Sequence, residues 1–243
     1  MFKFKFFGYR KIQPFIVSII IVSAVLAAYC WVFERNADEL YIGAVSRPED
    51  KIIILDAGHG GEDCGAIGVD GTYEKDLNLQ FTFEIGRQLE EKNFTVVYTR
   101  TEDKLLYKPE ENIKGIRKIS DLKNRSKIAR DYPEAIFISI HMNTFGEEKY
   151  WGTQIYTSEN NPESRKLAEI IQYEIKSTLQ QGNERRVKSG EQIYILKNID
   201  NVGILIECGF LSNKAECEKL SQKEYQKQLS FSIVCGIIEY VGK

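Results

Sequence analysis

The chain has 243 residues, of which 43% are hydrophobic and 28% charged, so it is long enough to build one large domain or two small ones around a real core. Its net charge of −2 hides an uneven distribution, because residues 1–35 carry five basic side chains and only one acidic one. The remainder is therefore more acidic than the total suggests, which argues against nucleic-acid binding, since that requires basic side chains to neutralise phosphates.

An uncharged run of 19 residues, Phe15 to Phe33, is the first feature in chain order. As a helix it would span roughly 28 Å, close to the thickness of the hydrocarbon core of a bilayer. The residues before it include four basic side chains, so the positive-inside bias places the N-terminus in the cytoplasm and everything after residue 34 outside. We therefore expect a cytoplasmic stub and membrane anchor at 1–34, a linker at 35–49 and a folded domain at 50–243.

A cleaved signal peptide is the alternative, and it would make the protein secreted instead of a single-pass protein of the cell membrane. Signal peptides usually have a shorter apolar region, of about 7–15 residues, and a cleavage site made of small residues. Here the run is longer and closes with the bulky sequence Tyr29-Cys30-Trp31, which favours a retained anchor.

From Lys51 onward, short apolar runs rich in β-branched residues alternate with amphipathic runs. We expect strands at Ile52–Asp56, Thr95–Thr99, Ala135–His141, Gly152–Tyr156, Gln192–Leu196 and Gly203–Glu207. We expect helices at Glu74–Lys92, Leu122–Tyr132, Pro162–Gln180 and Lys223–Val241. This alternation predicts an α/β domain with a mainly parallel, twisted central sheet of about six strands and helices on both faces.

Five cysteines are spread along the chain without CxxC spacing: Cys30, Cys64, Cys208, Cys217 and Cys235. The spacing indicates no dense disulfide framework, although a Cys208–Cys217 pair stays open.

Four polar residues stand where the chemistry of an open α/β sheet collects, at the carboxyl ends of strands. His59 and His141, the only two histidines, follow or end apolar strands; Glu74 opens a helix, and Glu207 ends the strand GILIE. Taken singly, each has an ordinary structural explanation. Together they provide two imidazoles and a carboxylate, which is a known set of catalytic zinc ligands, plus a second carboxylate for proton transfer. No HExxH helix is present, so the layout differs from the usual metalloproteases.

The motifs DAGHGG, GTYEKDLNLQ, FISIHMN and ILIECGFLSN, in that order, resemble those of the zinc-dependent N-acetylmuramoyl-L-alanine amidases of the amidase-3 family. The resemblance covers about residues 50–242. It implies that His59, Glu74 and His141 bind Zn²⁺ and that Glu207 is the catalytic acid and base. The implied reaction is hydrolysis of the amide between the lactyl group of N-acetylmuramic acid and L-alanine in peptidoglycan.

Further residues of these motifs are expected to support the site. Asp56 is predicted to accept a hydrogen bond that orients a ligating imidazole, and Asn143 to bond substrate or orient a loop. Arg100 and Asp103 resemble a family TRxxD segment and are expected to form a structural pair, and Arg125 is expected to be structural too. The run at 198–202 lacks the proline that relatives often carry there, and a thiolate from Cys64 or Cys208 is a weaker alternative ligand.

A bare catalytic domain behind a membrane anchor resembles the germination-specific amidases of spore formers, which trim cortex peptidoglycan so that muramic-δ-lactam is made. That resemblance implies peptidoglycan muropeptides as substrate, a location in the forespore or cortex space, and an anchor or an activating or tethering partner protein that keeps the enzyme near its substrate. Two other interpretations stay open. One is a catalytically quiet peptidoglycan-binding or activator protein that keeps the fold, and the other is a different metallohydrolase, such as a peptidase.

Overall fold

The computed structural model describes residues 51–113 and 116–242. The predicted membrane segment at 15–33 lies outside these residues. Within the two described ranges, no helix is both long enough and apolar enough to cross a bilayer.

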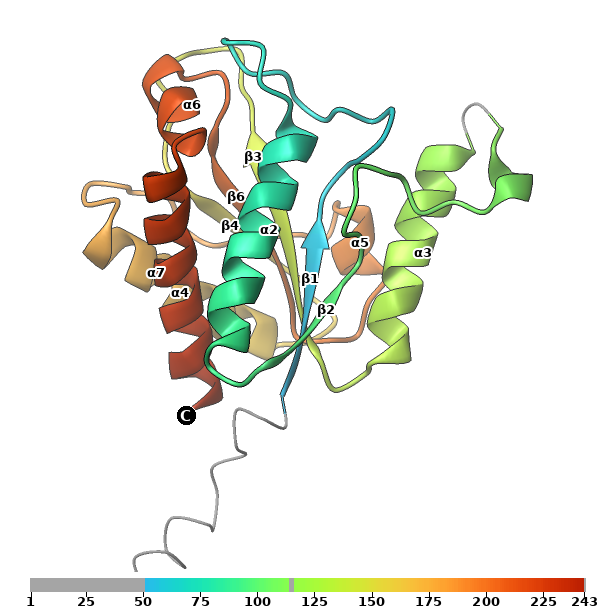
Figure 1. Cartoon of the computed structure of the whole chain (residues 1–243). Helices are drawn as coiled ribbons and strands as arrows, with labels where there is room; N and C mark the ends of the chain where they lie inside the picture. The colour runs from blue at the N-terminus through green and yellow to red at the C-terminus, as the bar shows by residue number, and fades with distance from the viewer. Residues whose placement is uncertain (1–50, 114–115, 243) are drawn as a thin grey trace, which may run out of the picture. The chain divides into compact units, whose positions relative to one another are not determined.

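A six-stranded sheet forms the centre of the described domain, in the order β2-β1-β3-β6-β4-β5 (Figure 1). All neighbouring strands run parallel except β4 and β6, which are antiparallel. The strands are β1 (Ile52–Ala57), β2 (Thr95–Tyr98), β3 (Ile136–Asn143), β4 (Gln154–Thr157), β5 (Lys188–Ser189) and β6 (Gly203–Phe210). The predicted fold class of a mixed, mainly parallel α/β sheet is confirmed.

Helices cover both faces of this sheet, because successive side chains of each buried strand point to opposite sides and both sides are apolar. Ile53 and Leu55 pack into the core shared with α2, α4 and α7, whereas Ile54 packs into the core shared with α3 and α5. The helices are α2 (Glu74–Glu90), α3 (Arg117–Asp131), α4 (Glu163–Thr178), α5 (Tyr194–Lys197), α6 (Lys214–Leu220) and α7 (Lys223–Val241), with a 3₁₀ turn, η3, at Pro109–Glu111.

One predicted strand is wrong. The run Gln192–Leu196 does not join the sheet; its second half is the short helix α5, and the sixth strand is instead the two-residue β5. Ile195 and Leu196 are buried in the α3–α5 core, so the run is apolar because it covers the sheet face. A short apolar run has the same composition in a strand and in a buried helical turn, and periodicity does not separate the two.

The four described cysteines, Cys64, Cys208, Cys217 and Cys235, are all free thiols. Cys208 and Cys217 are both buried in the α2–α4–α7 core without forming a bond to each other. The possible Cys208–Cys217 pair is therefore absent from the structure.

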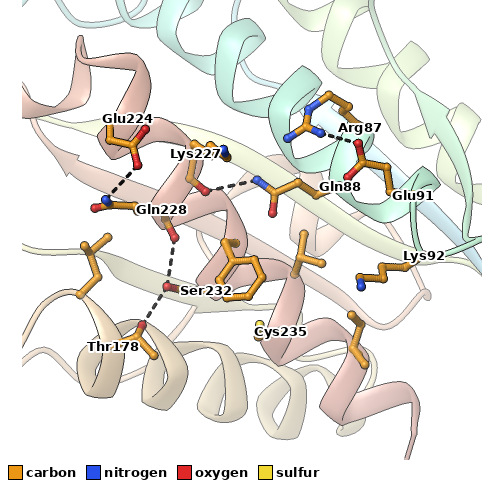
Figure 2. Close-up of a pocket in the computed structure, with 14 residues that line it drawn as sticks. Arg87, Gln88, Glu91, Lys92, Thr178, Glu224, Lys227, Gln228, Ser232 and Cys235 are labelled. Atoms are coloured by element: carbon orange, nitrogen blue, oxygen red, sulfur yellow. Dashed lines mark hydrogen bonds and ion pairs between the residues drawn. The ribbon is translucent and has the colours of Figure 1, made fainter.

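A hollow of about 850 Å³ lies where α2, α4 and α7 meet on the helical face (Figure 2). Hydrogen bonds join the helices that form its walls. The Gln88 amide on α2 donates to the Lys227 carbonyl on α7 at 3.2 Å, and the hydroxyls of Ser232 on α7 and Thr178 on α4 lie 2.8 Å apart. The residues that line this hollow include none of the four candidate site residues, which are His59, Glu74, His141 and Glu207. The fold therefore separates this groove from the chemistry at the carboxyl edge of the sheet.

Candidate metal centre

His59 reaches the carboxyl edge of the sheet through a tight turn that follows β1. The residue itself has a φ of +60°, in the left-handed region that non-glycine residues seldom adopt. The preceding position, Gly58, requires glycine because a Cβ there would overlap the imidazole ring of His141. The glycines of DAGHGG thus allow the two histidine-bearing segments to approach each other closely.

Glu74 arrives from a different element, as the first residue of α2. Its side chain is almost fully buried, and its two carboxylate oxygens accept hydrogen bonds from the backbone N–H groups of Ala66 (2.7 Å) and Met142 (3.1 Å). Burial works against ionisation here, but hydrogen bonds from His141 and His59 hold the pKa of Glu74 far below its usual range. Glu74 is therefore an ionised carboxylate that is held by two backbone N–H groups and contacts both imidazoles.

These three side chains converge on one point. Glu74 Oε1 lies 3.2 Å from His59 Nε2 and 2.9 Å from His141 Nδ1, and the three candidate ligand atoms all lie within 4.8 Å of one another. Ligands about 2.0 Å from a tetrahedral zinc ion are separated by roughly 3.3 Å. Two imidazole nitrogens and a carboxylate oxygen at these separations suit Zn²⁺, and three protein ligands leave a fourth position open, as catalytic zinc sites do.

The other nitrogen of His59 also has a partner, which fixes the orientation of the ring. His59 Nδ1 lies 2.9 Å from Asp63 Oδ2, and Lys118 Nζ lies 3.2 Å from the same oxygen. Burial disfavours the charged imidazole, but the hydrogen bonds to Asp63 and Glu74 raise the pKa of His59 to about 9. A carboxylate on the far nitrogen of a ligating histidine sets its tautomer and increases its basicity, so Asp63 completes a carboxylate–histidine pair.

The orienting role expected for Asp56 therefore belongs to Asp63. Asp56 is buried on β1 and accepts hydrogen bonds from Thr99 Oγ1 (2.7 Å), Ser139 Oγ (2.6 Å) and Arg125 (2.6 Å), with no imidazole among its partners. One feature of the sequence points to Asp63, which comes four residues after His59 in the same glycine-rich loop.

Asp56 instead binds the guanidinium of Arg125, which in turn holds the backbone of the loop that carries His59. Arg125 is fully buried on α3 and donates to the backbone carbonyls of Ala57 (2.6 Å) and His59 (2.8 Å) as well as to Asp56. A second aspartate, Asp121, accepts from its Nε at 2.8 Å. Arg125 thus has the structural role expected of it, and it acts on the backbone that presents the first histidine.

The predicted pairing of Arg100 with Asp103 is not seen. Arg100 donates to the backbone carbonyls of Ala57 (2.9 Å) and Gly58 (3.0 Å). Asp103 accepts from Lys75 Nζ at 2.6 Å and from the N–H of Gly61 at 2.7 Å. Both residues brace the histidine loop, but through separate partners.

Glu207 lies next to His141 on the neighbouring strand, because the two are register partners in the parallel pair of β3 and β6. Its Oε2 atom is shielded from water and has no hydrogen-bond partner among the described residues, although other parts of the side chain are partly exposed. Burial is the main cause that raises the pKa of Glu207 to about 7. The negative charge of Glu74 also raises this pKa, and the electrostatic effect of His141 lowers it. An unpartnered buried carboxyl oxygen that titrates near neutrality is suited to accept and return a proton.

The remaining candidates lie at or near the same edge without joining the cluster. Asn143 ends β3; its carbonyl accepts from the N–H of Leu211 at 2.8 Å, and its side chain makes no hydrogen bond within the described residues. Cys208 is buried on the opposite sheet face from Glu207, and Cys64 donates to the Gly65 carbonyl at 3.3 Å. Within the described residues, the potential metal-binding group consists of His59, Glu74 and His141, without a thiol.

The chain is similar to known proteins over most of its described length. Residues 53–239 match the family model described as N-acetylmuramoyl-L-alanine amidase. The chain is 38% identical to the germination-specific N-acetylmuramoyl-L-alanine amidase of Bacillus subtilis over 192 residues, which is 78% of this chain and 79% of that protein. Among solved structures, it is similar to the CwlD amidase of Clostridioides difficile in complex with the GerS lipoprotein, with a TM-score of 0.75, 40% identity, and coverage of 79% of this chain and 98% of that one. It is also similar to the amidase AmiC2 of Nostoc punctiforme (TM-score 0.69, 26% identity, coverage of 79% and 98%).

Proposed function

Because the chain belongs to the N-acetylmuramoyl-L-alanine amidase family, we propose that it uses zinc to hydrolyse the amide between the lactyl group of N-acetylmuramic acid and L-alanine in peptidoglycan. The observation that supports this most directly is the unpartnered Oε2 atom of Glu207 beside the cluster of His59, Glu74 and His141. Binding of peptidoglycan alone does not require a buried carboxyl oxygen without a hydrogen-bond partner, and such an atom costs stability.

Each side chain of the cluster has a distinct part in this proposal. His59, Glu74 and His141 would hold zinc, which when bound supplies Lewis-acid activation of water and of the amide carbonyl. Glu207 takes the proton from the attacking water and then delivers it to the nitrogen of L-alanine as the C–N bond breaks, so one carboxyl group serves as base and then as acid. Asp63 and Arg125 hold the His59 ring and its loop in place.

The physiological role that we propose is processing of spore-cortex peptidoglycan on the way to muramic-δ-lactam. The name of the Bacillus subtilis relative specifies germination, and the Clostridioides difficile relative is described in complex with a lipoprotein. For this chain, we propose a single-pass anchor formed by the apolar run at 15–33, with the catalytic domain outside the cytoplasm, and a protein partner that activates or tethers it. Muropeptide profiling of spores from a strain that lacks the protein tests the role, because retained muramic-δ-lactam would contradict it.

The chemistry is tested with the full-length chain in detergent. We expect zinc-loaded protein to release free amine from purified muropeptides, and we expect His59→Ala to lose both zinc and activity. We expect Glu207→Gln to lose activity while keeping its zinc. Zinc-loaded wild-type protein that binds muropeptides but releases no amine would favour a quiet binding or activator protein instead.

A further inference from the structure

Two aromatic rings flank the guanidinium of Arg185 at the edge of the sheet that also carries the candidate metal centre. The Arg185 guanidinium carbon lies 4.3 Å from the centre of the Phe210 ring and 5.9 Å from that of Tyr150. Phe145 packs edge-on against Tyr150, with ring centres 4.8 Å apart. Phe210 ends β6, three residues after Glu207, and is the register partner of Asn143 on β3. The guanidinium therefore lies over the carboxyl edge of the sheet, where the metal centre also is.

Several buried groups hold this arrangement in place. Arg185 donates through Nε to the Trp151 carbonyl at 2.8 Å, which ties the loop after α4 to the segment between β3 and β4. The buried carboxylate of Glu216 accepts from the N–H groups of Gly152 (2.8 Å) and Phe210 (2.7 Å). Asn183 donates to the Thr153 carbonyl at 3.1 Å. The guanidinium is thus positioned by contacts that do not involve its two terminal nitrogens.

Those terminal nitrogens are available. Arg185 is partly exposed, and among the described residues its two terminal amino groups have neither a hydrogen-bond acceptor nor an ion-pair partner. The nearby Glu216 carboxylate is already engaged with two backbone N–H groups. A planar guanidinium with two free donors in a fixed fork suits bidentate binding of a carboxylate, and the Phe210 ring stacked beside it holds the fork in one orientation.

The fold also links Arg185 to the catalytic carboxylate. Gln154 on β4 is the register partner of Glu207, and its amide donates to the Arg186 carbonyl at 2.6 Å. Tyr156 lies on the same strand face as Gln154; burial and the negative charge of Glu207 raise the pKa of Tyr156, and the positive charge of Arg185 opposes them. Both charges thus act on the hydroxyl group of Tyr156, which lies on the strand face shared by Gln154, the register partner of Glu207.

We propose that Arg185 binds a free carboxylate of the stem peptide and is a specificity-determining residue of the enzyme. This inference rests on the proposed function. In a stem that begins with L-alanine and isoglutamate, the first free carboxylate beyond the bond to be cleaved belongs to isoglutamate, the second residue. One residue of extended chain covers about 3.3–3.6 Å, so this carboxylate stays close to the catalytic edge when the L-alanine nitrogen is at Glu207.

The test compares two disaccharide tripeptides that differ only at the second stem residue, which is isoglutamate in one and isoglutamine in the other. Their affinities are measured by calorimetry with full-length, zinc-loaded Glu207→Gln protein, in which hydrolysis does not interfere. We expect Arg185→Ala to weaken binding of the isoglutamate compound about 10-fold, equivalent to 1.4 kcal/mol, and that of the isoglutamine compound less than 2-fold. Arg185→Lys, which keeps the charge but not the fork, is expected to lose about 3-fold.

Arg165→Ala is the matched control, because Arg165 is an exposed arginine of α4 paired with Glu169, and we expect it to leave both affinities unchanged. Equal loss for the two compounds with Arg185→Lys, or no loss with Arg185→Ala, would overturn the proposal. In the otherwise wild-type chain, Arg185→Ala is expected to raise KM for the isoglutamate compound and to leave kcat nearly unchanged. The binding measurement needs no turnover, so failure of the amidase assay and failure of the carboxylate site are separate results.

Discussion

The carboxylate of Asp63 and the imidazole of His59 lie 2.9 Å apart, four residues from each other in one loop, and the pair aims the opposite ring nitrogen at Glu74. Removing such a supporting carboxylate typically lowers metal affinity 10–100-fold. We therefore expect Asp63→Asn to weaken zinc binding by that factor, measured by competition with a chromogenic chelator. Glu62→Gln is the control, since Glu62 pairs with Arg117 and not with a histidine. Equal affinities for Asp63→Asn and wild type would show that Asp63 does not support the metal centre.

Glu207 is expected to be needed for turnover and not for binding of metal or substrate. General acid–base groups typically contribute 10²–10⁴-fold to a rate. Glu207→Gln should lower kcat by at least about 10²-fold, with stoichiometric zinc by elemental analysis and a substrate affinity within a few-fold of wild type. A variant that loses zinc together with activity would instead place Glu207 among the ligands.

Arg125 is expected to be a major contributor to stability, because it neutralises Asp56 in a site where both side chains are only 2% exposed. Removing one member of a buried ion pair leaves the other uncompensated and typically costs about 3–5 kcal/mol. We expect that loss for Arg125→Ala in urea denaturation. Arg130→Ala, on the exposed side of the same helix, should change the free energy of unfolding by less than about 0.5 kcal/mol. Similar losses for both variants would argue against the buried pair.

The same pair predicts how stability depends on pH. Burial opposes ionisation of Asp56, but Arg125 and the hydroxyls of Ser139 and Thr99 outweigh it and hold the pKa of Asp56 below its usual value. An aspartate with a depressed pKa in the folded state stabilises above its unfolded pKa of about 3.9, and that stabilisation is lost as the pH falls through the folded value. Asp56→Asn should therefore be less stable than wild type at pH 7, with a gap that narrows below about pH 4. A gap that stays constant from pH 7 to pH 3 would contradict this sign.

Much of the fold was predictable from the sequence because the buried strands are continuous apolar runs and the long helices have clear periodicity. Lys223–Val241 was predicted at its observed bounds, and Glu74–Lys92 within two residues. The failure at Gln192–Leu196 arises where a four-residue helix buries its apolar side on the sheet, since burial makes such a segment as apolar as a strand.

The site was partly predictable for a related reason. Carboxyl ends of parallel strands share an edge, so two histidines after two apolar runs were expected to meet, and the structure places their rings 4.9 Å apart. The supporting contacts depend on loop geometry that no periodicity encodes. Asp56 and Asp63 both lie within four residues of His59, and the loop after β1, with its left-handed turn at His59, brings Asp63 and not Asp56 to the imidazole.

The identity of the products tests the central claim most directly. Full-length, zinc-loaded protein is incubated with purified disaccharide tripeptide, and the products are separated and identified by tandem mass spectrometry. The account predicts two products, a disaccharide that keeps its lactyl carboxylate and a free peptide with an N-terminal L-alanine. Cleavage within the stem peptide, or an intact substrate after incubation with fully zinc-loaded protein, would contradict it.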